Sequence, residues 1–163
     1  MWAPWRIGYV TGDRPDGCVF CAKIEADDDD TNHVLHRGEH NAILLNTYPY
    51  NSGHLMVVPN AHVANLTDLS PEAGCELWAL TDLAVRTLKQ ALQPQGLNIG
   101  MNLGQAAGAG IGDHIHMHIV PRWSGDTNYM TTVAQTRVVP QSLEDSYQQL
   151  LPVIRKLTSG DEG

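Results

Sequence analysis

The sequence predicts an α+β domain built around an antiparallel sheet. Two observations favour this class: short apolar runs separated by turn residues come first and return late in the chain, and one long amphipathic helix pattern lies between them. The length agrees, because 163 residues fit one domain of ordinary size. We expect a single domain over 1–163, with an N-terminal arm at 1–17, a core at 18–158 and a flexible tail at 159–163.

The first part of the chain predicts three strands. Two of them, at 34–37 and 41–46, have the pattern of a short hairpin. After a run of turn residues, a third strand is expected at 54–59, where a proline stops it. The acidic run 27–30 ahead of them is expected to be a solvated turn.

The second part predicts a long helix, two strands and a closing helix. A serine N-cap followed by proline begins the helix expected over 70–92, and its apolar residues recur at spacings of three and four. Alternating patterns then predict strands at 97–103 and 114–120, and the proline directly after the second is expected to end it. A weaker helix pattern covers 143–157, with a kink expected at Pro152.

Composition and charge exclude several classes of protein. The net charge of −8, with only 10 Lys and Arg, argues against binding to extended nucleic acid, which needs clustered cations. No apolar run approaches the ~20 residues that cross a bilayer, and the first residues lack the order of a signal peptide. Cys18, Cys21 and Cys75 are too few for a disulfide framework and suit a reducing compartment. We therefore expect a cytoplasmic protein without a membrane partner.

Three histidines, His114, His116 and His118, alternate with apolar residues. Because alternate side chains of a strand share a face, their rings are expected on one face, about 6–7 Å apart. Neutral imidazole is a nucleophile and exchanges protons, so this row suits attack on a phosphorus atom. Alternating histidines on a strand also hold zinc, and the spacing alone leaves both interpretations open.

Residues 102–113, just before the histidines, form a loop with little side-chain bulk. Backbone N–H groups around Gly108 and Gly110 would approach phosphate oxygens closely and bind an anion without Lys or Arg. The alternative is that these glycines only make a tight connection between strands. A dinucleotide-binding fold is excluded, because its glycine fingerprint must open a helix, whereas a strand follows here.

Cys18 and Cys21 form a Cys-x-x-Cys pair near the N-terminus. The pair is compatible with a metal site, a redox pair or buried free thiols. The residues before it do not supply the strand that a redox motif would need. A tetrahedral zinc set exists if His62 and His114 complete it.

The histidine row and its surroundings resemble the histidine triad (HIT) superfamily, whose signature is His-φ-His-φ-His-φ-φ with φ apolar. Residues 114–120 match the signature at every position, and 46–59 resembles the family's strand pair ending in Gly-His-φ-φ-Val-φ-Pro. A further resemblance, to the bacterial branch of diadenosine tetraphosphate phosphorylases and hydrolases, lies in residues 102–104, 107–108, 121–123 and 125–130. The resemblance implies the HIT-like fold with a long helix and a C-terminal helix, and a homodimer paired through the long helix and a neighbouring strand.

The resemblance also implies a two-step nucleotidyl transfer. His116 would attack the α-phosphorus of a nucleoside polyphosphate, and water or inorganic phosphate would then release the nucleotide. His118 would contact the α-phosphate, while His114 would support the leaving group or bind metal. The resemblance further implies that Asn102 lies near the bridging oxygen, Asn46 at the ribose and His54 beside the phosphates, with Leu44 in the base pocket. Gly108 and Gly110 are the candidates for binding phosphate from the loop. Trp123 is expected either to pack in the fold or to stack on a base.

Relatives with the Cys-x-x-Cys pair resemble zinc proteins with Cys18, Cys21, His62 and His114 as ligands, so structural zinc is expected. Such a zinc ion would hold the N-terminal arm against the strand expected at 114–120, and His116 would not be one of its ligands.

One departure from the family pattern concerns 110–113. Many members carry Gln-Ser-Val or Gln-Thr-Val here, whereas this chain has Gly-Ile-Gly-Asp, so no side-chain contact carries over and a backbone contact from the loop is the hypothesis that replaces it. The space this leaves for inorganic phosphate favours phosphorolysis of diadenosine tetraphosphate over hydrolysis. The alternatives are a nucleoside phosphoramidase, a zinc-dependent metallohydrolase and a nucleotide-binding module without turnover.

Overall fold

Five strands form one sheet in the order β1-β2-β3-β5-β4, and every neighbouring pair is antiparallel. The structure is a computed structural model that describes residues 17–126 and 141–160. Most of the expected arm at 1–17 and part of the tail at 159–163 lie outside these residues. The strands are β1 (Val34–Arg37), β2 (Asn41–Leu45), β3 (Leu55–Pro59), β4 (Gly96–Gly100) and β5 (Met117–Arg122); the helices are α2 (Val19–Glu25), α3 (Asp29–Asn32), α4 (Pro71–Leu92) and α6 (Leu143–Ser159), with 3-10 turns η2 (Leu66–Asp68) and η3 (Gln105–Ala107).

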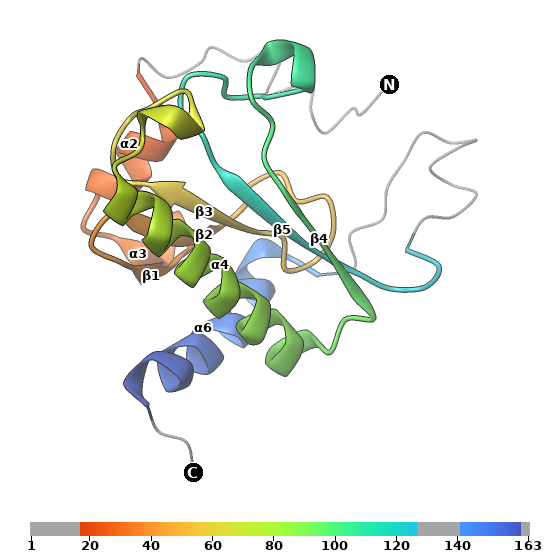
Figure 1. The fold of residues 1–163 in the computed structure, drawn as a ribbon. Helices are drawn as coiled ribbons and strands as arrows, with labels where there is room; N and C mark the ends of the chain where they lie inside the picture. The colour runs from red at the N-terminus through yellow and green to blue at the C-terminus, as the bar shows by residue number, and fades with distance from the viewer. Residues whose placement is uncertain (1–16, 127–140, 161–163) are drawn as a thin grey trace.

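The two long helices cover one face of the sheet (Figure 1). The predicted cap of α4 is present, because the Ala73 N–H donates to Ser70 Oγ at 3.1 Å and Pro71 occupies the first turn. α6 contains Pro152, and the helix continues past it. None of the helices in the described part of the chain combines the length and apolar character that crossing a membrane requires.

Each face of the sheet has its own apolar core. Residues of β2 alternate between them, so Ile43 and Leu45 face α4 and α6, whereas Ala42 and Leu44 face the opposite side. On that opposite side the short helix α2 contributes Phe20, which is 4% exposed. The sheet is therefore covered by long helices on one face, while a smaller core and α2 lie on the other.

The acidic run is partly helical, which corrects the expected solvated turn. Asp29 to Asn32 form α3, and the Asp28 carboxylate caps it by accepting the Thr31 N–H at 3.1 Å. Acidic side chains stabilise a helix N-terminus through its partial positive charge, so this composition suits the first turn of a helix.

β5 differs from the expected strand at both ends. It begins at Met117 rather than at residue 114, because its pairing with β3 starts at Met117, whereas the Ile115 N–H donates to the Val63 carbonyl in the loop after β3. It also continues through Pro121 to Arg122. A proline is tolerated at 121 because β3 pairs with β5 only as far as Ile119. No residue of β3 therefore lies opposite Pro121 to accept the N–H that proline lacks.

Candidate active site

The histidine row divides into a pair and a separate ring. The ring centroids of His116 and His118 are 4.7 Å apart, in an edge-to-face arrangement. His114 instead lies with its ring centroid 4.9 Å from that of His62. All three rings nevertheless lie on the same side of the sheet, because the Phe20 ring of the smaller core lies 5.5 Å from that of His114 and 4.9 Å from that of His116, while His118 alternates on β5 with Met117 and Ile119 of the other core. The expected shared face is therefore observed, although only His118 belongs to β5.

His116 has one ring nitrogen engaged and one that retains its lone pair. Nδ1 lies 3.0 Å from the His114 carbonyl oxygen, which only accepts hydrogen bonds, so Nδ1 carries the proton. In the neutral ring Nε2 is then the unprotonated nitrogen. The residue is 7% exposed, and burial lowers its pKa, which favours the neutral ring. Nε2 of His116 is therefore suited to act as a nucleophile near neutral pH.

Hydrogen bonds also assign the protons of His118 and His54. The Tyr50 N–H donates to His54 Nδ1 at 3.1 Å, so a neutral His54 carries its proton on Nε2. That Nε2 lies 3.0 Å from His118 Nδ1 and donates to it. His118 therefore keeps its own proton on Nε2, as a donor suited to a phosphate oxygen. His54 is fully buried, so its influence on a bound phosphate passes through His118.

Two aromatic residues of this site were not among the residues selected from the sequence. The Phe20 ring centroid lies 4.9 Å from that of His116, and the Tyr50 ring centroid lies 4.8 Å from His54 and 5.8 Å from His118. The sequence offered only a local indication for each: Phe20 lies between the two cysteines of Cys-x-x-Cys, and Tyr50 lies in the turn just before Gly53-His54. Neither signal specifies which ring the aromatic side chain will contact.

The remaining nucleotide candidates lie around this pair at different depths. Asn46 follows β2, and its N–H donates to the His54 carbonyl at 2.9 Å. Leu44 shares its face of the sheet with Met56 in the smaller core and is fully buried. Trp123 follows β5, is partly exposed, and donates its N–H to Asp126.

The glycine-rich loop connects β4 to the histidines. Asn102 Nδ2 donates to the Gly108 carbonyl at 3.4 Å, which links the loop to the end of β4. Gly108 has φ +88°, a left-handed conformation that favours glycine, and Gly110 is exposed. The loop also contains the turn η3, so it is more ordered than a plain connection.

Four side chains beside this site have the geometry of a metal centre. The ligand atoms of Cys18, Cys21, His62 and His114 all lie within 4.8 Å of one another. Cys18 Sγ is 3.2 Å from His114 Nδ1, and Cys21 Sγ is 3.3 Å from His62 Nδ1. A tetrahedral Cys₂His₂ zinc site places such atoms about 3.5 Å apart, so the spacing fits.

The protonation pattern around these four residues also favours a cation. His114 is fully buried and its Nε2 lies 2.8 Å from the Pro59 carbonyl, so Nε2 carries the proton and the Nδ1 lone pair faces the thiols. Burial and the neighbouring Cys18 raise the pKa of Cys21 to about 11. Two thiols at this position need a nearby positive charge to ionise, which a divalent metal supplies.

Comparison with known proteins identifies related chains over most of the sequence. Residues 28–125 match the HIT domain family. An AP-4-A phosphorylase of Mycobacterium tuberculosis (strain CDC 1551 / Oshkosh) is 39% identical over 158 residues, which cover 92% of this chain and 81% of that protein. A Zn-bound histidine triad family protein from Mycobacterium smegmatis has a TM-score of 0.71 and 31% identity, over 89% of this chain and 98% of the other. A diadenosine triphosphate hydrolase of Plasmodium falciparum shares the fold, with a TM-score of 0.62 and 16% identity over 85% and 93% of the two chains.

Proposed function

This chain belongs to the HIT family, and from that membership we propose that it is an enzyme that cleaves dinucleoside polyphosphates through a covalent nucleotidyl-histidine on His116. The observation that carries the proposal is the buried, unprotonated Nε2 of His116, whose ring lies 4.7 Å from that of the proton donor His118. The similarity to an AP-4-A phosphorylase supports diadenosine tetraphosphate as the substrate.

The first step forms a bond between His116 Nε2 and the α-phosphorus and breaks the bond from that phosphorus to its bridging oxygen. The His118 Nε2–H is positioned to donate toward the α-phosphate oxygens as charge develops there. His114 has no ring nitrogen to offer a leaving group, because one faces the Pro59 carbonyl and the other faces the thiols. We therefore assign His114 to the metal centre rather than to the leaving group.

In the second step an oxygen nucleophile displaces the nucleotide from His116. With inorganic phosphate, diadenosine tetraphosphate yields ATP and ADP; with water, it yields ATP and AMP. The N–H groups of Ala107, Gly108 and Ala109 already donate to the Gly104 and Gln105 carbonyls, so the loop does not offer them to an anion. The similarity to an AP-4-A phosphorylase is what supports phosphate as the nucleophile. We therefore propose phosphorolysis as the preferred reaction.

Incubation with diadenosine tetraphosphate, with and without phosphate, tests this choice. We expect ADP to appear only when phosphate is present, as measured by chromatography of the products. Cleavage to ATP and AMP at the same rate in both samples would contradict phosphorolysis. Absence of cleavage in both would contradict the proposed reaction, and a parallel sample with an adenosine phosphoramidate then tests the phosphoramidase alternative.

We propose that Cys18, Cys21, His62 and His114 bind a structural zinc ion. The donor set and its spacing support this, as does the similarity to a Zn-bound relative. When bound, the ion would stabilise the thiolates and fix α2 against the segment that leads into β5. Reduced thiols of this kind support a cytoplasmic location.

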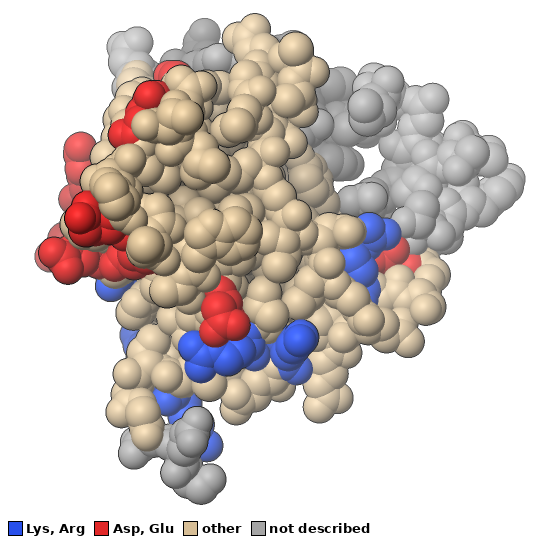
Figure 2. Space-filling view, in the orientation of Figure 1, with Lys and Arg blue, Asp and Glu red and all other residues tan. Residues whose placement is uncertain are grey.

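We further propose that two chains pair through α4 and β4 to form a homodimer. Trp78 on α4 is 63% exposed and Ile99 on β4 is 45% exposed, and within the described residues β4 pairs only with β5. The surface between the start of α4 and the end of β4 is mostly uncharged (Figure 2). An open edge strand beside exposed apolar side chains is a common dimer interface.

Replacing Trp78 by glutamate is expected to convert the dimer to a monomer, because a buried carboxylate at the interface would lack a partner. Sedimentation velocity measures the change. Leu66→Glu is the matched control, since Leu66 is 47% exposed but lies outside α4 and β4. A monomeric wild-type chain at micromolar concentration would contradict the proposed dimer.

A further inference from the structure

Asp126, just after β5, accepts hydrogen bonds from three directions. Arg122 donates from Nε at 2.6 Å and from Nη2 at 2.9 Å, which makes a bidentate ion pair. The Asn51 side chain donates at 3.0 Å, and the Trp123 N–H at 3.2 Å. The Asp126 side chain is only 11% exposed. A largely buried carboxylate with this many donors fixes the segments that supply them.

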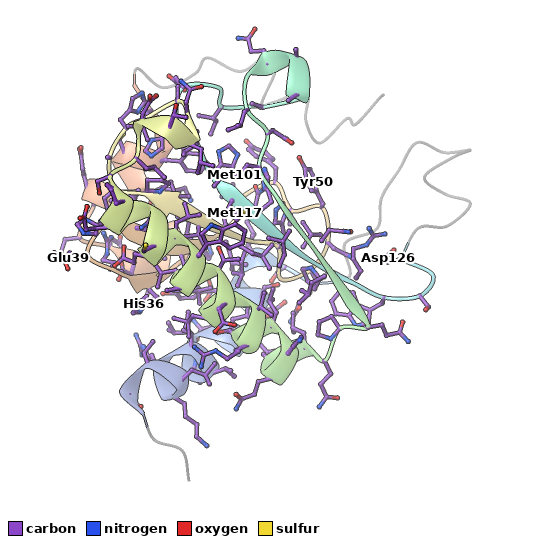
Figure 3. The ribbon with its side chains drawn as sticks, in the orientation of Figure 1. His36, Glu39, Tyr50, Met101, Met117 and Asp126 are labelled. Atoms are coloured by element: carbon purple, nitrogen blue, oxygen red, sulfur yellow. The ribbon has the colours of Figure 1, made fainter. Side chains whose placement is uncertain are left out.

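Asn51 connects this carboxylate to the active site. It lies in the turn 46–54 between β2 and β3, and its Nδ2 also donates to the Pro121 carbonyl at 3.0 Å. Its own carbonyl accepts the His54 N–H at 3.2 Å. In Figure 3, Asp126 and Tyr50 mark the two ends of this region. A continuous chain of hydrogen bonds thus leads from Asp126 through Asn51 and His54 to His118.

The turn 46–54 depends on such anchors, because it contains no helix or strand of its own. The Asn46 N–H also joins the two ends of the turn by donating to the His54 carbonyl at 2.9 Å. The turn packs closely at Gly53, which has φ +74° and where an added Cβ would meet Leu92 Cδ1. Packing at Gly53 sets the position of the turn against α4, whereas the bonds to Asn51 set it against β5. The buried His54 ring is held within the turn by the Tyr50 N–H, which donates to its Nδ1. Its bond to His118 on β5 therefore depends on where the whole turn lies relative to β5, which the bonds to Asn51 determine.

We propose that Asp126 is a positioning residue for the nucleotidyl transfer: by holding Asn51 it fixes the turn 46–54 and keeps His54 hydrogen-bonded to His118. This inference rests on the function proposed above. In this role Asp126 acts through the Asn51 amide that it binds, and it is assigned no contact with the reacting atoms. A charge-assisted bond to the Asn51 amide is stronger than a neutral one, which is why a carboxylate is needed here.

The test compares Asp126→Asn with a matched control, Asp29→Asn. Asp29 of α3 also pairs with an arginine, since Nε and Nη2 of Arg37 on the opposite edge strand β1 both contact its Oδ1, at 2.8 and 2.7 Å. We expect Asp126→Asn to lower kcat for diadenosine tetraphosphate about tenfold with KM changed less than about threefold, because misorientation of a catalytic group mainly slows the chemical step. Asp29→Asn should leave both constants unchanged.

Asn51→Ala and the double variant test whether Asp126 affects kcat through Asn51. If Asp126 acts through Asn51, Asn51→Ala should lower kcat by a similar factor, and combining both changes should lower it no further. Losses that multiply in the double variant would overturn the proposal. So would an Asp126→Asn protein whose melting temperature falls while kcat, measured well below that temperature, stays at the wild-type value.

A spectroscopic measurement separates this inference from the proposed reaction. The ¹⁵N chemical shifts of the His118 and His54 rings report which nitrogen carries the proton, independently of turnover. We expect Asp126→Asn to shift or broaden these signals, and Asp29→Asn to leave them unchanged. If wild-type protein cleaves no diadenosine tetraphosphate, the proposed function fails, whereas unaltered ring signals in Asp126→Asn would overturn the positioning role by itself.

Discussion

Replacing His116 by alanine should abolish cleavage of diadenosine tetraphosphate and leave nucleotide binding nearly intact. The variant removes the only atom assigned to form the bond with phosphorus, so kcat should fall on the order of 10⁴-fold or more. Binding should survive, because the proposed contacts to ribose, base and phosphate come from other residues. Product chromatography measures turnover, and calorimetric titration with AMP measures affinity.

The covalent intermediate provides a second measurement for His116. Mass spectrometry of wild-type protein, quenched during turnover without phosphate, should detect one nucleotidyl group on the chain, and His116→Ala should carry none. His36→Ala is a suitable control, since His36 is a partly buried histidine on β1, outside the site. A His116→Ala protein that retained a tenth of wild-type turnover would contradict the covalent mechanism and favour direct attack by water or phosphate.

Local chemistry made much of the fold predictable. The cap at Ser70 and the proline at 71 determine the start of α4, and the leucine and alanine spacing determines which side faces the sheet. The strands near 34–37, 41–46 and 54–59 were found within one residue at each end. These features depend on residues close in sequence, so pattern and propensity identify them.

The division of the histidine row was not predictable in the same way. Whether His114 continues the strand depends on the Ile115 N–H bonding to Val63, and its tautomer depends on the Pro59 carbonyl, 55 residues away. Pro121 was expected to end β5. A strand tolerates a proline where no neighbouring strand needs its N–H, and here that depends on β3 pairing with β5 only as far as Ile119. Contacts between distant segments therefore decide what each histidine can do, although the residue types were identified from the sequence.

Removing the proposed zinc should destabilise the fold and slow catalysis together. A ligand that binds only the folded chain stabilises it by about 4 kcal/mol when its concentration is a thousand times its Kd, so chelation should lower the free energy of unfolding by a similar amount. Cys21→Ser should have the same effect, because it removes one of four ligands. Elemental analysis of the isolated protein and denaturant unfolding with and without a chelator measure both quantities. Cys75→Ser is the matched control, since Cys75 is exposed and lies outside the cluster.

The expected pH dependence of zinc release follows from the ligands. The thiols must lose their protons to bind metal, so protons compete with zinc and affinity should fall as the pH is lowered. In the free protein the raised pKa of Cys21, about 11, strengthens this competition. Zinc should therefore be retained at neutral to alkaline pH and released in acid. A metal content that does not change between neutral and acidic pH would contradict thiolate ligation.

The relation between zinc and turnover distinguishes a structural ion from a catalytic one. In the proposed zinc site His114 would contribute its ring to the metal, while its carbonyl accepts the His116 Nδ1–H at 3.0 Å. Release of the ion would therefore loosen the residue that orients the nucleophile. Turnover should then decline in step with the loss of folded structure and return when zinc is restored. A zinc-dependent metallohydrolase would instead lose all activity at once while its unfolding curve stayed unchanged. In that case the metal, rather than His116, would have to activate the attacking group.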